Sequence, residues 1–243
     1  MNIGCIIRSV GERTEGLCIE SARRHLSESN IQVIRDVKPF SLALEKMFEI
    51  AKEKEYDWYF GLDADVVLVE DWLLKAKDTI SSLKKDHYRI DFPVKDRFVT
   101  DVVYAGIHLY NHKFTEEARE ILNQTRGENK PEGNIRHKIS CPEHTEREIY
   151  LGYHGYLQYH RDIFSRFALR YKRDKRYVKK YEIFKEMDTE KGVAKRGWEY
   201  AMEEDVDFMH ADSRSLYLSE YGYEIVPLNM TLNEFYKLIR EIV

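Results

Sequence analysis

The sequence has no long apolar run and few cysteines. None of its apolar runs approaches the roughly 20 residues that cross a bilayer, and residues 1–10 lack the charged start and apolar stretch of a secretory signal. Three cysteines, Cys5, Cys18 and Cys141, are too few for a disulfide framework, so we expect reduced thiols. Internal repeats and low-complexity tracts are also absent. These absences argue against membrane-spanning, repeat and disulfide-stabilised proteins and favour a cytoplasmic location.

Charge is spread unevenly along the chain. The formal net charge is only -4, but residues 166–196 hold twelve Lys or Arg and five Asp or Glu. At 243 residues, 43% of them hydrophobic, the chain can bury the core of one domain. We therefore expect a single folded domain that carries one basic segment on an otherwise acidic body.

The first 65 residues alternate between strand-like and helix-like patterns. Short apolar runs predict strands at residues 3–7, 31–34 and 56–62, and apolar residues at helical spacing predict helices at residues 17–26 and 41–51. This order is typical of a parallel sheet with right-handed crossovers. Since ligands of such sheets bind beyond the carboxyl ends of the strands, we expect three polar clusters to converge there: Arg8–Arg13, Asp36 and Asp63–Asp65.

The patterns beyond residue 65 predict a mixture of elements. Helices are expected at residues 70–85, 115–123, 172–185, parts of 198–218, and 232–243. Strands are expected at residues 88–94, 99–110 and 223–226. Residues 124–147 are polar and contain two prolines, so they are predicted to form a loop.

Asp63 and Asp65 follow a predicted buried strand directly, so both carboxylates project from a strand end. Oxygen ligands suit Mg²⁺ or Mn²⁺, which bind through one or two carboxylates and let substrate phosphates complete the coordination. The same residues can also be read as aspartates of a turn that ends the strand.

Four short motifs occur in a fixed order along the chain. Residues 51–65 end in Leu62-Asp63-Ala64-Asp65, residues 160–164 read His-Arg-Asp-Ile-Phe, residues 203–208 read Glu-Glu-Asp-Val-Asp-Phe, and residues 221–225 read Tyr-Gly-Tyr-Glu-Ile. Together they resemble the D-x-D segment, the arginine-containing segment, the Glu-Asp motif and the glycine turn of glycosyltransferases of the GT-A fold, particularly family 2. Arg8–Arg13 departs from that family, which has a proline-threonine-tyrosine-asparagine loop after the first strand.

The resemblance implies an α/β, Rossmann-like domain that binds a nucleotide sugar on a mostly parallel sheet. Residues 1–110 would bind the donor, and residues 111–243 would face the acceptor, with a helical basic insertion at about 166–196. The donor would be a nucleoside diphosphate sugar, with uridine expected before guanosine. Mn²⁺ or Mg²⁺ would assist, and the transfer would invert the sugar.

The resemblance also implies roles for single residues. Asp63 and Asp65 would hold the metal, Asp63 would also contact the ribose, and Asp36 would read the base. The other implied roles are the general base for Asp205 with Glu204 in the same motif, a further metal ligand for His210, and diphosphate contacts for Arg8, Arg13 and Arg161.

Several of these residues can also have purely structural roles. Glu203–Asp207 can be a solvated acidic helix face, and His210 can be a hydrogen-bonded polar group, with His154 as a rival metal ligand. A zinc site is a further reading, but its residues match no standard spacing: His137, Cys141, His144 and His154.

Three functions are compatible with these patterns. The favoured one is sugar transfer to a hydroxyl acceptor. The basic segment is then either an amphipathic helix or a contact for a polyanionic acceptor, such as a hydroxymethylated DNA base or a lipid-linked or phosphate-bearing glycan. A nucleotidyltransferase on the same fold is the first alternative, with only Gly11 and Arg13 hinting at its glycine-rich basic loop. The second is a nucleic-acid-binding module without catalysis, in which the carboxylates are structural.

Overall fold

A computed structural model describes residues 1–99, 102–126, 131–173, 189–203 and 228–242. The chain divides into two compact units. The first unit holds residues 1–95, 102–154 and 230–243, and the second holds residues 96–101 and 155–229.

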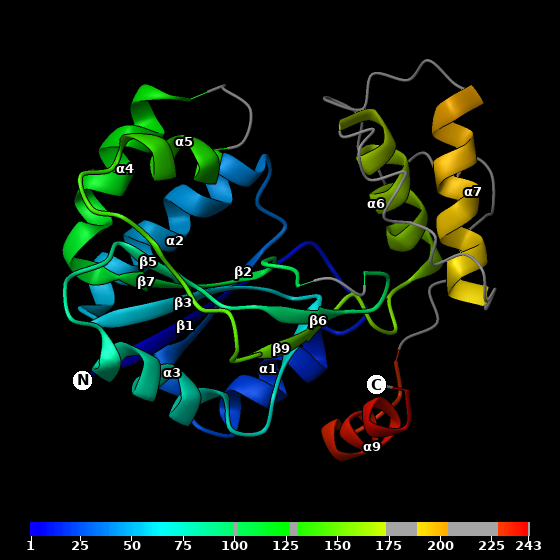
Figure 1. Cartoon of the computed structure of the whole chain (residues 1–243), viewed down its shortest axis with the longest axis horizontal. Coiled ribbons are helices and arrows are strands. Elements are labelled where there is room, and N and C mark those ends of the chain that lie inside the picture. Colours follow the sequence, from blue (N-terminus) through cyan, green and yellow to red (C-terminus); the bar gives the residue numbers. More distant parts are fainter. Residues whose placement is uncertain (100–101, 127–130, 174–188, 204–227, 243) are drawn as a thin grey trace. The chain divides into compact units, whose positions relative to one another are not determined.

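A six-stranded sheet forms the centre of the first unit (Figure 1). Its order is β2-β1-β3-β7-β5-β8. Strands β1, β2 and β3 are parallel, β7 runs antiparallel to both β3 and β5, and β8 is parallel to β5. The bounds are β1 Ile3–Ser9, β2 Ile31–Arg35, β3 Trp58–Asp63, β5 Arg89–Asp91, β7 Ile107–Asn111 and β8 His144–Thr145. The predicted α/β class with a mostly parallel sheet is therefore confirmed.

Helices cover both faces of this sheet. Figure 1 shows α2, α4 and α5 on one side and α1 and α3 on the other. Their bounds are α1 Glu15–Arg23, α2 Phe40–Lys54, α3 Trp72–Ser82, α4 Thr115–Gln124 and α5 Pro131–Lys138. A second, small sheet has the order β4-β9-β6, with bounds β4 Val66–Leu68, β9 Gly152–His154 and β6 Val94–Asp96.

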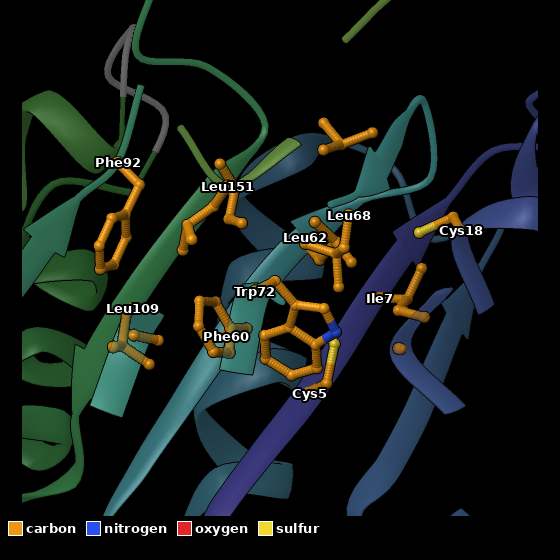
Figure 2. Close-up of a cluster of buried hydrophobic side chains, with 14 of the residues drawn as sticks. Cys5, Ile7, Cys18, Phe60, Leu62, Leu68, Trp72, Phe92, Leu109 and Leu151 are labelled. Atoms are coloured by element: carbon orange, nitrogen blue, oxygen red, sulfur yellow. The ribbon is translucent and has the colours of Figure 1, made fainter. Parts of the chain in front are cut away.

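Alternation along the strands gives the sheet two apolar faces. On β1, Cys5 and Ile7 pack on the side of α1 and α3, while Ile6 packs on the side of α2. Successive side chains of a strand point to opposite faces, so a strand between two helix layers must be apolar at nearly every position. On the α1 and α3 side, Figure 2 shows the Trp72 indole beside Phe60, and their ring centroids are 5.0 Å apart.

The C-terminal helix α9 (Leu232–Ile242) belongs to the first unit and has a built-in start signal. Thr231 and Glu234 bond reciprocally: the Glu234 carboxylate accepts from Thr231 N at 2.8 Å, and Thr231 Oγ1 accepts from Glu234 N at 3.3 Å. This capping box satisfies backbone donors of the first turn. Tyr236 then donates to the carbonyl of Leu68 at 2.6 Å, which fixes α9 to β4.

The structure corrects two predictions in the middle of the chain. Residues 124–147 are not all loop, because they contain α5 and β8. Helix α5 buries a single apolar side chain, Ile135, so the sequence carries no apolar period that would reveal it. The strand expected at residues 99–110 begins only at Ile107 as β7, because Gly106 has a φ of +71° and interrupts the extended chain.

The second unit contains α6 (His160–Arg173) and α7 (Thr189–Glu203), which pack against each other. Gly197 makes the close approach possible, since a Cβ there would lie 2.3 Å from the carbonyl oxygen of Phe164. Arg166 forms a salt bridge of 2.7 Å with Asp96 within the same unit.

Several predictions fall outside the described residues. They are the strand at 223–226, most of the helix at 172–185, and the part of 198–218 that follows residue 203. Among the helices that are described, none combines the length and apolar character needed to cross a bilayer.

Candidate functional site

A cavity of about 310 Å³ opens at the carboxyl ends of β1, β2 and β3. All of its lining residues belong to the first unit: Arg8, Ser9, Val10, Glu12, Ile34, Val37, Lys38, Phe40, Ala43, Asp63 and Asp65. Its volume lies at the small end of the range for small-molecule sites. Two of the three expected polar clusters therefore meet in one cavity wall.

Backbone hydrogen bonds fix the turn that carries the two aspartates. The N–H of Asp63 donates to the carbonyl of Gly106 at 2.7 Å, and the N–H of Ala64 donates to the carbonyl of Arg8 at 3.0 Å. The buried hydroxyl of Thr14 donates to the carbonyl of Ala64 at 3.0 Å. Because three separate segments hold the turn, its side chains leave the end of β3 in a defined direction.

Asp63 makes an ion pair with Arg8 of the neighbouring strand. Its Oδ1 accepts from Arg8 Nε at 3.0 Å and lies 2.8 Å from the second terminal nitrogen, and the Arg8 side chain is only 6% exposed. Within the described residues, Oδ2 of Asp63 has no hydrogen-bonding partner. Burial raises the pKa of Asp63; Arg8 opposes this, and the nearby charges of Asp65 and Glu132 add to it.

Asp65 lies beside His154, which the sequence analysis names only as an alternative metal ligand to His210. His154 Nε2 is 3.2 Å from Asp65 Oδ2, and the histidine side chain is buried. The contact arises because β4, which follows the turn directly, pairs with β9 so that Val66 faces His154. His154 is thus placed to orient Asp65.

The two aspartates fit a hard divalent cation. Both line one cavity. Burial is the main cause of the raised pKa of Asp63, and the negative charges of Asp65 and Glu132, which a cation would compensate, add to it. No group of three or more His, Cys, Asp or Glu in the described part of the chain is arranged to hold a metal. A metal here would therefore take further ligands from water or substrate phosphate, as Mg²⁺ commonly does.

The four residues of the zinc reading are not brought together. His154 contacts Asp65, whereas the ring of His144 lies 5.4 Å from that of His87. The absence of any three-residue metal group among the described residues agrees with this separation.

The loop after β1 presents a carboxylate to the cavity. The N–H of Val10 and the hydroxyl of Ser9 both donate to Glu12 Oε2 at 2.9 Å, and the N–H of Gly11 donates to Ser9 Oγ at 3.0 Å. Burial raises the pKa of Glu12, the bonds from Val10 and Ser9 counteract it, and the charge of Asp65 adds to the increase. The backbone donors of Val10 and Gly11 are thus bound by side chains of the loop itself.

Other predicted residues lie away from the cavity wall or outside the description. Asp36 follows β2 with a φ of +55° and donates its N–H to Ser9 O at 2.9 Å, but the nearby residues Ile34 and Val37 line the cavity instead.

Arg13 is in the loop after β1 and is not a lining residue. Arg161 is on α6 in the second unit, with its guanidinium over the Tyr159 ring. Glu204, Asp205 and His210 are outside the described residues.

No pattern in the sequence predicts the carboxylate that contacts Arg8 from the side opposite Asp63. Glu132 of α5 lies 3.2 Å from the remaining terminal nitrogen of Arg8 and also accepts from the Tyr110 hydroxyl at 2.9 Å. Burial alone would raise the pKa of Glu132, but His108, Arg8 and the other positive neighbours lower it to about 2. Residues 124–147 read as a polar loop, and nothing in that pattern marks one glutamate among them.

Comparisons with known proteins find likenesses of fold only. No family model matches the chain, and no curated protein matches it. Among solved structures it is similar to a glycosyltransferase involved in the glycosylation of the major capsid of PBCV-1, with 13% identity, 63% of this chain and 93% of that chain covered, and a TM-score of 0.46.

Two further solved structures are similar over different lengths. The 4-diphosphocytidyl-2C-methyl-D-erythritol synthase from Anaerococcus prevotii has 9% identity, with 64% of this chain and 90% of that chain covered, and a TM-score of 0.45. Residues 1–349 of S. aureus TarS have 10% identity, with 99% of this chain and 78% of that chain covered, and a TM-score of 0.42. With TM-scores below 0.5 and identities of 9–13%, these three likenesses concern the fold and do not select a reaction.

Proposed function

We propose that this protein is a metal-dependent glycosyltransferase that moves a sugar from a nucleoside diphosphate sugar to a hydroxyl acceptor. One observation carries the proposal: Asp63 and Asp65 line a single cavity at the carboxyl ends of three parallel strands. Open α/β sheets bind ligands at that edge, and two carboxylates there suit a divalent cation shared with a diphosphate.

In this proposal, the apolar lining residues of the cavity form one wall of the donor site and the charged lining residues form the other. Ile34, Val37 and the exposed ring of Phe40 offer apolar surface for a nucleobase. Asp36, at the end of β2, is the residue proposed to read the base. A small cavity favours the smaller pyrimidine, so uridine remains the proposed base before guanosine.

The charged wall would hold the diphosphate. Asp63 and Asp65 are the proposed metal ligands, with His154 orienting Asp65 through its 3.2 Å contact. Mn²⁺ or Mg²⁺, when bound, would stabilise the negative charge on the departing diphosphate. Lys38 lines the same cavity and is a further cation for that charge. Arg13 and Arg161 remain proposed diphosphate contacts from the sequence.

The acceptor side rests on the sequence alone. Asp205, with Glu204 beside it, is the proposed general base that takes the proton of the acceptor hydroxyl, which would invert the sugar. His210 remains a proposed metal ligand. The basic residues of segment 166–196 are proposed to meet a polyanionic acceptor.

The loop after β1 supports sugar transfer over nucleotidyl transfer. A nucleotidyltransferase usually carries a glycine-rich, basic loop after the first strand. Here the N–H of Val10 is bound to the Glu12 carboxylate and that of Gly11 to Ser9, so these two donors already have partners within the loop.

The proposal is tested by measuring nucleoside diphosphate release from UDP-sugars and GDP-sugars with Mn²⁺ or with EDTA. We expect release with Mn²⁺ only. Asp65→Asn should reduce kcat/KM by at least about 100-fold, more than the usual effect of an outer-shell partner, because it removes a carboxylate from the metal. Asp205→Asn should retain donor binding and lose transfer.

Asp71→Asn is the matched control. Asp71 is an exposed aspartate whose carboxylate pairs with Lys75 at 2.9 Å, so its loss removes equal charge without touching the cavity. Release of pyrophosphate from a nucleoside triphosphate would instead identify a nucleotidyltransferase. Equal turnover of the Asp65→Asn variant and the wild type would remove the D-x-D assignment.

A further inference from the structure

Arg8 has every side of its guanidinium engaged. Two of its nitrogens face Asp63 Oδ1 at 3.0 and 2.8 Å, and the third lies 3.2 Å from Glu132 Oε1. The Phe40 ring covers the guanidinium, and the central carbon Cζ of Arg8 lies 4.8 Å from the centre of that ring. A planar cation held in this way by two carboxylates and a ring has one orientation.

Glu132 is itself held from the opposite side. The Tyr110 hydroxyl donates to Oε1 at 2.9 Å, and His108 Nε2 lies 3.8 Å from Oε2. The other nitrogen of His108 lies 2.6 Å from Asp91, which pairs with Arg89 at 2.8 Å. Glu132 of helix α5 therefore lies within a continuous row of contacts that runs from Asp63 at the cavity through Arg8 to His108, Asp91 and Arg89.

We propose that Glu132 is a positioning residue for Asp63: through Arg8, it fixes Oδ1 of Asp63 and leaves Oδ2 for the metal and donor. The inference rests on the proposed function and extends it to a residue of α5 that does not line the cavity. Glu132 and Asp63 both contact the Arg8 guanidinium, so Glu132 acts on Asp63 through Arg8 and does not itself contact the reacting groups.

Charge gives Glu132 a second effect on the same site. Arg8 and Asp63 alone would form a neutral pair, and a metal would have to compete with a full positive charge beside its ligand. With Glu132 added, the three side chains carry one net negative charge. The site therefore attracts a cation more strongly while its ligand stays fixed.

The first test is Mn²⁺ binding followed by electron paramagnetic resonance, which needs no turnover. Glu132→Gln should weaken Mn²⁺ binding about tenfold, in the range for partners that orient metal ligands. Glu132→Asp restores the charge at a shorter reach and should recover part of the affinity. Glu132→Gln should also raise KM for the donor more than it lowers kcat.

Glu143→Gln is the matched control. Glu143 contacts Arg89 of the same row at 3.0 Å and Arg136 at 2.6 Å, but it does not contact Arg8. Its side chain is 12% exposed, against 23% for Glu132. Its loss should lower stability and leave Mn²⁺ affinity unchanged. Equal weakening by Glu143→Gln and Glu132→Gln, or wild-type affinity in Glu132→Gln, would overturn the positioning role.

A second measurement does not depend on a metal. It is a double-mutant cycle that compares Asp63→Asn, Glu132→Gln and the variant that carries both changes. Each single change leaves Arg8 with one carboxylate partner, whereas the double change leaves the buried Arg8 cation with neither. The fall in Tm for the double variant should exceed the summed single falls by about 3 °C or more. Additive falls would overturn the link between Glu132 and Asp63. If the wild type binds no Mn²⁺, the proposed function fails and this cycle alone decides the link.

Discussion

At the scale of single residues, the position of Arg8 limits what its charge can do. The sequence suggested Arg8 as a cation for the diphosphate, and the residue does line the cavity. Its charge is already shared between Asp63 and Glu132 in a side chain that is 6% exposed. Because Arg8 is buried and already paired with two carboxylates, it is better suited to orient Asp63 than to neutralise a bound diphosphate.

Glu132 gives a pH dependence whose sign follows from its lowered pKa. Its pKa in the folded protein is about 2, below its ordinary value. Ionised Glu132 therefore stabilises the folded protein by roughly 3 kcal/mol. This contribution is fully present above about pH 5 and is lost as the pH falls towards 2. Between pH 6 and pH 3, the wild type should lose about 2 kcal/mol more of its free energy of unfolding than Glu132→Gln does.

Urea unfolding at the two pH values measures this difference. All other carboxylates are common to both proteins, so the comparison isolates Glu132. If both proteins lose the same free energy between pH 6 and pH 3, the low pKa of Glu132 is wrong.

At the scale of elements, the segment before β7 supports the turn that carries Asp63 and Asp65. Gly106 has a φ of +71°, and its carbonyl accepts the N–H of Asp63. A Cβ at this position would lie 2.6 Å from a methyl carbon of Val66 and 3.5 Å from the Asp63 Cβ. The geometry of the turn thus depends on a glycine more than forty residues further along the chain.

Gly106→Ala should therefore destabilise the protein and disturb the turn. We expect a loss of about 2 kcal/mol, from a strained φ and a close contact, together with weaker Mn²⁺ binding. Chemical denaturation and Mn²⁺ titration measure the two effects.

Gly16→Ala provides the control. Gly16 is in α1, and a Cβ there meets no atom within 4 Å, so alanine should raise stability by about 0.5–1 kcal/mol through its helix propensity. Similar behaviour of the two alanine variants would show that the backbone at Gly106 is not constrained.

At the scale of the whole molecule, the cavity belongs to one unit of a two-unit chain. All lining residues of the cavity lie in the first unit, as do Trp58 and Trp72, whereas Trp198 lies in the second. Tryptophan fluorescence can therefore follow the first unit alone in a Trp198→Phe variant.

UDP together with Mn²⁺ should raise the Tm of the first unit in that variant. A ligand at 100 times its Kd adds about 2.7 kcal/mol to the folded state, which corresponds to roughly 5–10 °C for a chain of this size. EDTA should cancel the shift, and Asp65→Asn should prevent it. An unchanged Tm at millimolar UDP and Mn²⁺ would argue against a nucleotide site in this cavity.

Local patterns determined the architecture around the site. Apolar runs and helical spacing in the first 65 residues predicted β1, α1, β2, α2 and β3, because each pattern reflects burial of one segment between two layers. The same patterns placed Asp63 and Asp65 at a strand end, and the parallel pairing of β1 with β3 brought them to Arg8.

Only the tertiary structure decided how these side chains are held. Glu132 is 124 residues from Arg8 in the sequence, and His154 reaches Asp65 through the pairing of β4 with β9. Such contacts depend on strand order and helix docking, and an ion pair leaves no periodic trace in the sequence. The sequence by itself therefore determined which carboxylates stand at the edge of the sheet, and the packing of distant segments determined their orientation and charge.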